Sequence, residues 1–405
     1  MRVILIVDWC FVNGGQAKVA LDSALALKSA GHEVVLFSAV GPADPTLSAA
    51  GIEVHCIDQP EFVADPSRVA AAWRAIDNRG AARALHGLLK AQPREGTIIH
   101  VHGWHKALSA AIAGPIRASK LPVLYTMHEY FLLCPNGGFY HYGTHEHCHL
   151  KPLSKACLTT NCDTRGWGFK LWRAARLAAA KHWHGLPRVL ADVAYFHPFQ
   201  RAIIERHLPV TTRLHEIANP IEVEALGPKP EPASGEIIFV GRLAEEKGVF
   251  LYAEAMRRAG LSPVFVGDGP AGASLKARYP ESKFLGWHDA PGVRRRLREA
   301  RALVFPSLWY EGQPLTVLES LALGTPVIAS DGSAGRESVR DGETGLWFRH
   351  GDAEDLARAI RTMGNDELVQ AMSHAAYRHY WREPFTLERH RRRLEEVYAG
   401  LLAAR

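Results

Sequence analysis

The chain has 405 residues, enough for about two domains of ordinary size. Hydrophobic residues make up 47% of it and charged residues 22%, which is typical of a folded globular protein and excludes a disordered chain. The formal net charge of +6 is well short of that of a nucleic-acid-binding arm, so we expect no nucleic-acid partner, although anionic ligands and anionic membrane surfaces are compatible with it.

The sequence begins with a short apolar run, residues 1–7, that ends at Asp8. This run is too short for the core of a signal peptide, and no stretch approaches the ~18 apolar residues of a membrane span. We therefore expect a cytoplasmic protein, whose six cysteines are reduced thiols or metal ligands rather than disulfides.

Strand and helix patterns alternate through the first half of the chain. Strands are expected at 2–7, 33–38, 52–57, 97–101 and 123–127. Helices are expected at 17–30, at 67–91 and from about Lys106. Strands separated by helices of about ten or more residues indicate a parallel sheet built of βαβ units.

The segment from about residue 130 to 165 breaks this alternation, and loops of this length are usually functional or disordered. It holds four cysteines: Cys134, Cys148, Cys157 and Cys162. Two interpretations stay open. Either the four thiols hold a structural zinc ion, with a nearby histidine replacing one of them, or they are ordinary thiols that pack the loop. The absence of a Cys-x-x-Cys pair weakens the zinc hypothesis.

The Pro-rich stretch 227–232 predicts a linker, after which the alternation restarts. Strands are expected at 236–240, 263–266, 283–285, 302–305 and 327–329, and helices from about Lys247, Ala290, Pro314 and Ala353. We therefore expect a first domain at 1–225, completed by a C-terminal helix at about 384–405, and a second domain at 226–383.

Two glutamates in the second half, Glu311 and Glu319, are separated by seven residues, among them Pro314. Proline suits the first position of a helix, so a helix is expected to begin there. The free N–H groups near Leu315 and Thr316, together with the helix dipole, then form an anion site suited to a diphosphate. The two carboxylates can accept hydroxyl hydrogen bonds on either side of it. The alternative for an isolated pair is a solvated loop acid and a surface helix residue.

Arg242 and Lys247 follow the strand at 236–240, at the end of a parallel strand where α/β proteins bind ligands. Two cations there can neutralise a diphosphate and stabilise it as a leaving group, unless they are a surface salt-bridge pair. In the first half, Gly14 and Gly15 follow the first strand and let backbone N–H groups approach a ligand closely, although a plain tight turn also explains them. His128 follows the fifth strand and is expected at the same rim, with a structural histidine as the alternative.

Taken together, these segments resemble the large retaining glycosyltransferase family called group 1 or family 4. The resemblance covers nearly the whole chain and is most specific between residues 241 and 345. It implies an α/β protein with the GT-B fold, in which two Rossmann-like domains face each other across a cleft. It also implies an enzyme that moves a sugar from a nucleotide-sugar donor to a glycan or lipid-linked acceptor, as in the synthesis of bacterial surface polysaccharides.

The resemblance assigns roles to individual residues of this chain. It implies that Glu311 and His128 act on the donor sugar, that Glu319 binds the ribose, and that Arg242 and Lys247 bind the diphosphate. It further implies that Gly14 and Gly15 form the glycine-rich first loop and that the loop ending in Trp287 brackets the nucleobase. Many family members have Asp after the histidine, whereas this chain has Glu129.

Retention of configuration implies that the donor's own phosphate helps to remove the acceptor proton, so that no protein nucleophile and no cofactor are required. An Asp-x-Asp triplet, which holds a divalent ion in the metal-dependent GT-A enzymes, occurs nowhere in the chain. We therefore expect transfer that does not depend on a metal ion.

Three other functions are alternatives for this sequence. A nicotinamide-dependent oxidoreductase is suggested by Gly267-Asp268-Gly269-Pro270-Ala271-Gly272, but this match lies inside the second half and not after the first strand. A nucleotide-sugar epimerase of related fold and a non-catalytic scaffold are the other two alternatives.

The segment 165–188 combines Trp167, Phe169, Trp172 and Trp183 with six Lys and Arg residues and no acid. Aromatic and basic residues on one helix suit an anionic membrane surface, so peripheral membrane association is expected, with an aromatic face packed inside the protein as the alternative.

Overall fold

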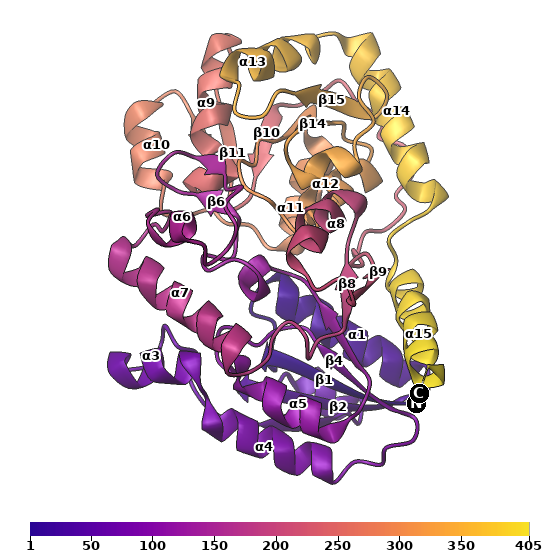
Figure 1. Cartoon of the computed structure of the whole chain (residues 1–405). Helices are drawn as coiled ribbons and strands as arrows, with labels where there is room; N and C mark the ends of the chain where they lie inside the picture. The colour runs from indigo at the N-terminus through magenta and orange to yellow at the C-terminus, as the bar shows by residue number, and fades with distance from the viewer. Residues whose placement is uncertain (405) are drawn as a thin grey trace. The chain divides into compact units, whose positions relative to one another are not determined.

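The computed structural model describes residues 1–404, which form two compact units (Figure 1). The first unit contains 1–139, 149–220 and 386–404. The second contains Tyr140–Cys148 and Ile221–Phe385, so a short hairpin from the first half of the chain belongs to the second unit by its contacts. Two α/β units with parallel sheets confirm the expected fold class.

The first unit is built on a parallel sheet of seven strands in the order β3-β2-β1-β4-β5-β8-β9. Its strands are β1 (Arg2–Trp9), β2 (Glu33–Val40), β3 (Glu53–Cys56), β4 (Thr97–Val101), β5 (Val123–Thr126), β8 (Asp192–Tyr195) and β9 (Arg213–Glu216). Residues 3–7 of the central strand are wholly buried, as expected of a parallel sheet covered on both faces. The last two strands were not predicted.

Helices and 3-10 turns surround this sheet. They are α1 (Gly15–Ser29), α2 (Pro45–Ala49), α3 (Arg68–Ile76), α4 (Arg79–Lys90), η1 (Ala110–Ile112), α5 (Ala113–Ser119), η2 (Tyr130–Leu132), α6 (Lys155–Leu158), α7 (Trp167–His182), α8 (Pro198–Ile204), η3 (Glu205–His207) and α15 (Leu387–Ala403). The C-terminal helix α15 returns to the first unit, where Leu394, Val397, Tyr398 and Leu401 join the core beside α1 (Figure 1).

The long helix expected at 67–91 is wrong, because the chain forms two helices, α3 and α4. Asn78 separates them: its side-chain oxygen accepts from the Ala81 N–H and caps α4. Its amide nitrogen donates to the Ala107 carbonyl at 2.9 Å. These bonds stabilise a non-helical residue between the two segments.

The helix expected from Lys106 begins later, at Ala110. The buried carboxylate of Asp8 accepts the backbone N–H groups of Lys106, Ala107 and Leu108 at 2.8–3.1 Å. These amides therefore bind the end of β1 and are not the start of a helix.

The second unit contains a parallel sheet of six strands in the order β12-β11-β10-β13-β14-β15. The strands are β10 (Ile237–Val240), β11 (Val264–Val266), β12 (Lys283–Phe284), β13 (Ala302–Phe305), β14 (Val327–Ser330) and β15 (Gly345–Phe348). The helices and 3-10 turns are η4 (Glu245–Lys247), α9 (Val249–Arg258), α10 (Gly272–Arg278), α11 (Ala290–Glu299), α12 (Leu315–Ala322), η5 (Ala334–Glu337), α13 (Ala353–Thr362) and α14 (Asp366–Arg382). The hairpin strands are β6 (Tyr140–His141) and β7 (Glu146–His147). Strand β15 and helices α10 and α14 were not predicted.

A close backbone approach joins the loops that follow the neighbouring strands β10 and β13. Gly248 has φ +73°, and a Cβ atom added there would lie 2.0 Å from the carbonyl oxygen of Pro306. Only glycine fits this contact, since a side chain would meet the backbone itself. The contact fixes the two loops against each other at the carboxyl edge of the sheet.

We predict that Gly248→Ala lowers the free energy of unfolding by about 3 kcal/mol or more, because it combines a left-handed backbone with a steric clash. Gly260→Ala is the matched control, since Gly260 has φ +76° and open space around the added Cβ atom. It should lose only about 1 kcal/mol. Urea denaturation of both variants measures the difference, and equal losses would contradict the role of the Pro306 contact.

Candidate functional site

An ion pair lies where the loops after β10 and β13 meet. Lys247 Nζ donates to Glu311 Oε1 at 2.6 Å, and Ser307 Oγ donates to the same oxygen at 2.8 Å. Lys247 Nζ also lies 5.3 Å from the centre of the Trp309 ring. The structure therefore brings together two of the residues expected at this edge and adds Ser307, which the sequence did not single out.

Charge balance within this pair sets the protonation of Glu311. Burial raises the pKa of Glu311, but the adjacent Lys247 cation and the hydrogen bonds outweigh burial and lower it below its usual value. The side chains are 12% exposed for Glu311 and 23% exposed for Lys247. Glu311 is thus ionised at neutral pH, and both side chains retain a path to a ligand.

Arg242 lies on the same loop as Lys247 but has a different partner. Its guanidinium donates to Glu246, whose side chain is nearly buried, while the Arg242 side chain itself is 54% exposed. Glu246 was not anticipated from the sequence. It orients Arg242 and leaves most of the guanidinium open to solvent.

The start of α12 differs by one residue from the prediction. Pro314 has ψ 89° and is the residue before the helix, not its first residue, so the helix begins at Leu315. Within residues 1–404, the amides of Leu315 and Thr316 make no hydrogen bond, and no side chain caps the helix. Two N–H groups at the positive end of the helix dipole therefore point away from it. Glu319 follows in the second turn and is half-buried.

The glycines after β11 have a structural explanation. A Cβ atom on Gly267 would lie 2.1 Å from the Gly241 carbonyl oxygen, and one on Gly269 would lie 2.4 Å from that of Leu243. The Gly-x-Gly pattern thus allows two strand-end loops to pack together, which removes the main support for a dinucleotide fingerprint.

Trp287 follows β12 at the same edge of the sheet. Its backbone N–H donates to Asp268 Oδ2 at 2.9 Å, and its side chain is 74% exposed. The backbone is therefore fixed while the ring is free to contact a planar group. Asp268 is a further residue that the sequence did not single out.

His128, in the first unit, belongs to a row of histidines at the ends of β4 and β5. Its Nε2 lies 3.1 Å from His102 Nδ1, and its ring packs against Phe196. Burial lowers the pKa of His128 to about 3 and lowers that of His102 well below its usual value. Both rings are consequently neutral at neutral pH, so His128 can exchange hydrogen bonds but carries no charge.

The residue after His128 has a defined partner. Glu129 Oε2 lies 2.8 Å from His105 Nε2, and His105 stacks on Phe131 at 4.5 Å. Burial raises the pKa of Glu129, but His105 and the nearby Lys106 outweigh burial and lower it to about 2. Glu129 is therefore ionised and bound to a buried histidine.

The glycine pair of the first unit lies at the start of α1. Gly14 has φ +95° and precedes the helix, and Gly15 is its first residue. Added Cβ atoms at both positions would meet nothing within 4 Å. Only the backbone angle of Gly14 requires glycine, while the space around both residues is open.

The cysteines of the 130–165 segment do not gather as a zinc site. Among residues 1–404 there is no group of three or more His, Cys, Asp or Glu residues placed to hold a metal ion. Instead, Cys157 and Cys162 surround the buried Lys170, whose Nζ donates to their sulfur atoms at 3.5 and 3.2 Å. Cys134 donates to Asn136, whereas Cys148 belongs to the second unit. Two of the four thiols thus pack around Lys170, as the alternative of ordinary packing thiols expects.

Comparison with known proteins identifies both halves of the chain. Residues 13–225, more than half of it, match the family described as Glycosyltransferase Family 4, and residues 234–366 match that described as Glycosyl transferases group 1. The phosphatidyl-myo-inositol mannosyltransferase of Mycobacterium leprae is 31% identical over 188 residues, which are 41% of this chain and 50% of that protein. The UDP-Gal:alpha-D-GlcNAc-diphosphoundecaprenol alpha-1,3-galactosyltransferase of Escherichia coli is 31% identical over 149 residues, 33% of this chain and 38% of that protein. The matched segments thus span half or less of these relatives.

Solved structures with the same fold cover the whole chain. The sucrose-phosphate synthase of Thermosynechococcus elongatus has a TM-score of 0.71 at 21% identity and covers 100% of both chains. Anabaena Alr3699/HepE, in complex with UDP and glucose, has a TM-score of 0.68 at 15% identity and covers 99% of this chain and 100% of that one.

We predict that buried histidines make the first unit sensitive to acid. His390 Nε2 lies 2.9 Å from Ser23 Oγ, and burial lowers the pKa of His390 from 6.5 to about 4. As the pH falls, the imidazole of His390 is protonated in the unfolded chain before it is protonated in the folded one. The free energy of unfolding is therefore unaffected above about pH 6.5 and decreases between about pH 6.5 and 4, by up to about 1.4 kcal/mol per pH unit. Denaturation measured between pH 6.5 and 4 should show that the free energy of unfolding depends less steeply on pH in His390→Gln than in the parent protein. The control is His86→Gln, an exposed residue of α4, which should leave the slope unchanged; a slope equal in all three proteins would contradict the prediction.

Proposed function

This chain belongs to glycosyltransferase family 4, in group 1, and from that membership we propose that it transfers a sugar from a nucleotide-sugar donor to a glycan or lipid-linked acceptor, with retention of configuration, in the synthesis of a bacterial surface polysaccharide. The observation that carries the proposal is the pairing of Lys247 with Glu311 beside the open amides of Leu315 and Thr316. A cation, a carboxylate and a helix N-terminus at one sheet edge match the charges and hydroxyls of a nucleoside diphosphate sugar.

Each donor-side residue then has a role. Lys247, Arg242 and the α12 amides neutralise the diphosphate, Glu319 accepts from the ribose, and Trp287 covers the base. We assign the sugar to Glu311 and His128, and contacts with the donor to the Gly14-Gly15 backbone. Because cations and amides already balance the diphosphate charge, we propose that transfer requires neither a metal ion nor a cofactor.

A panel of labelled nucleotide sugars tests the proposal. The purified protein should release a nucleoside diphosphate from one of them, faster when an acceptor extract is present and equally fast in chelator. Conversion of the donor to its epimer without release of nucleotide would support the epimerase instead, and binding without turnover would support the non-catalytic scaffold.

We predict that Lys247→Ala weakens the affinity for UDP or GDP by about 10–150-fold, because it removes a charged hydrogen-bond donor. Glu311→Ala should reduce turnover far more than it reduces this affinity, since it leaves Lys247 in place. Lys283→Ala is the matched control, because Lys283 is an exposed lysine of the same unit that pairs with Glu236. Calorimetry and steady-state kinetics measure the two effects. Unchanged affinity in Lys247→Ala, or equal losses in both quantities for Glu311→Ala, would contradict these assignments.

We also propose that the first unit binds an anionic membrane surface through α3 and α7. Trp73 on α3 is 65% exposed, and Trp167 and Phe169 on α7 are 46% and 42% exposed. A groove of about 520 Å³ lies between the two helices and is lined by apolar side chains together with Arg68 and Arg165. Exposed aromatic residues close to cations are typical of membrane contact.

The surface is smaller than the sequence suggested. Lys170 is buried, Trp172 donates its indole N–H to the Ala72 carbonyl, and Arg176 donates to the carbonyls of Ala75 and His105. These three side chains are thus bound to other parts of the protein, although Trp172 still lines the groove. No helix among residues 1–404 has the length and hydropathy that a membrane span requires.

We predict that the protein floats with phosphatidylglycerol vesicles at low salt and not with phosphatidylcholine vesicles, because anionic lipids attract the basic rim. The double variant Trp167→Ser/Phe169→Ser should reduce binding by at least about tenfold, since two aromatic rings no longer enter the interface. Trp287→Ser, which removes an exposed indole of the other unit, should bind like the parent. Absence of co-migration with anionic vesicles would refute the membrane contact.

A further inference from the structure

We propose that the β6–β7 hairpin is part of the donor site and that His147 is a positioning residue, which holds the loop carrying Glu311 by stacking on Tyr310. The inference rests on the proposed transfer reaction for its kinetic readout, but the contacts that carry it are independent of that reaction. Neither the motifs of the second half nor the cysteine pattern pointed to this hairpin.

The hairpin is a firmly built element. Tyr140 pairs with His147 and His141 with Glu146 across its two strands. Its turn is closed by His141 Nδ1, which accepts the backbone N–H groups of Gly143 and Thr144 at 3.2 and 3.1 Å. Tyr140 is completely buried, so the hairpin is anchored in the second unit at its first residue. A short antiparallel pair is marginal alone, and these contacts supply the stability that it lacks.

His147 lies between two rings of the second unit. Its ring centre is 3.8 Å from that of Tyr310, at an interplanar angle of 17°, and 4.4 Å from that of His350, at 26°. Such near-parallel packing restricts a side chain in position and in tilt. Since Tyr310 precedes Glu311 directly, the stack restrains the backbone that carries the carboxylate.

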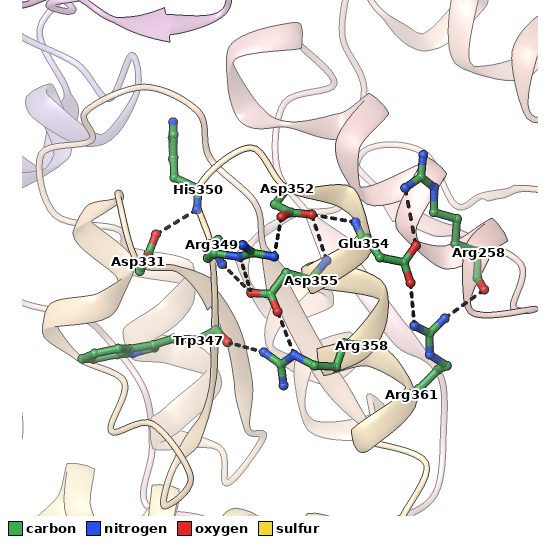
Figure 2. A network of polar contacts seen from close by, with 10 residues as sticks. All are labelled: Arg258, Asp331, Trp347, Arg349, His350, Asp352, Glu354, Asp355, Arg358 and Arg361. Atoms are coloured by element: carbon green, nitrogen blue, oxygen red, sulfur yellow. Dashed lines mark hydrogen bonds and ion pairs between the residues drawn. The ribbon is translucent and has the colours of Figure 1, made fainter.

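The far side of this stack is rigid. His350 Nδ1 lies 2.9 Å from Ser330 Oγ, and its backbone N–H donates to Asp331 Oδ1 at 2.8 Å. The neighbouring Arg349 joins a network with Asp352 and Asp355 at the start of α13, from which the His350 ring points away (Figure 2). A Cβ atom on Gly332 would lie 2.8 Å from the His350 ring, which leaves that ring little room to move. The His350 ring is therefore held in place, and His147 packs against it.

A second contact links the hairpin to the other loop of the ion pair. His145 Nε2 lies 3.6 Å from Glu245 Oε2, and Glu245 begins the 3-10 turn that ends at Lys247. The hairpin thus touches the two loops whose tips form the Lys247–Glu311 pair. Apart from the 3-10 turn at 245–247, loops 241–247 and 306–314 contain no helix or strand. The contact that the hairpin makes with each loop therefore affects how Lys247 and Glu311 are placed relative to each other.

The test compares His147→Ala, which removes the ring, with His147→Phe, which keeps a stacking ring without the imidazole nitrogens. His147→Ala should lower kcat for the nucleotide sugar that the panel identifies by about 10–100-fold, because a small displacement of a catalytic group is costly. The affinity for UDP or GDP should change by less than about threefold, since the diphosphate ligands are untouched. His147→Phe should restore most of kcat, and His149→Ala, an exposed histidine outside the hairpin, should behave like the parent.

Hydrogen exchange of amides 308–313 supplies a readout that needs no turnover. These amides should exchange faster in His147→Ala and at the parental rate in His147→Phe. If the parent protein transfers no sugar, the proposed function fails while the exchange data still decide the positioning role.

Unchanged kcat and exchange in His147→Ala would overturn the proposal, as would a failure of His147→Phe to restore either. If thermal melting shows that His147→Ala is unfolded, His147→Leu, which fills the space without a ring, takes its place under the same criteria.

Discussion

The site that we propose for the donor depends on the contact between the backbone of Gly248 and the carbonyl of Pro306. The carboxyl ends of parallel strands lie at one edge of a sheet. This arrangement does not by itself fix the distance between the loops that follow β10 and β13. The absence of a side chain at Gly248 lets the loops touch, and Lys247, the preceding residue, then reaches Glu311. The lack of a side chain at Gly248 therefore allows the ion pair between Lys247 and Glu311 to form.

The pair also bears on how a ligand would bind. Lys247 and Glu311 satisfy each other in the protein described here, so the site is charged but locally balanced. If the diphosphate of the proposed donor binds Lys247, it competes with Glu311 for the ammonium, and the released carboxylate can then accept from sugar hydroxyls. Because breaking a nearly buried pair without a replacement is costly, the proposed roles imply that binding of phosphate and binding of sugar are coupled through this exchange.

Much of the architecture could be predicted because buried parallel strands are continuous apolar runs, as in β1, β10, β13 and β14. Strand β8 was missed because it begins with Asp192, whose carboxylate pairs with Arg213 and lies 2.8 Å from His215 Nε2 on the neighbouring β9, contacts that no local pattern reveals. Contacts between residues far apart in the chain also limit how much of the candidate site the sequence predicts. Glu311 and Lys247 belong to short motifs, whereas the stack of His147 on Tyr310 joins residues far apart in the chain. Counting cysteines, likewise, did not reveal that the buried Lys170 lies beside Cys157 and Cys162.

The path of the chain has a consequence for building hybrid enzymes. Helix α15 supplies Leu394, Val397, Tyr398 and Leu401 to the core of the first unit, after the whole of the second unit's main segment has been completed. The hairpin, in turn, is encoded inside the first unit but packs with the second. The second unit is therefore not one contiguous segment of the chain. A chimaera that grafts another protein's donor preference onto this chain must be spliced at 220 and 385 and must also carry the matching 140–148 segment, or the transplanted half will lack an element of its own packing.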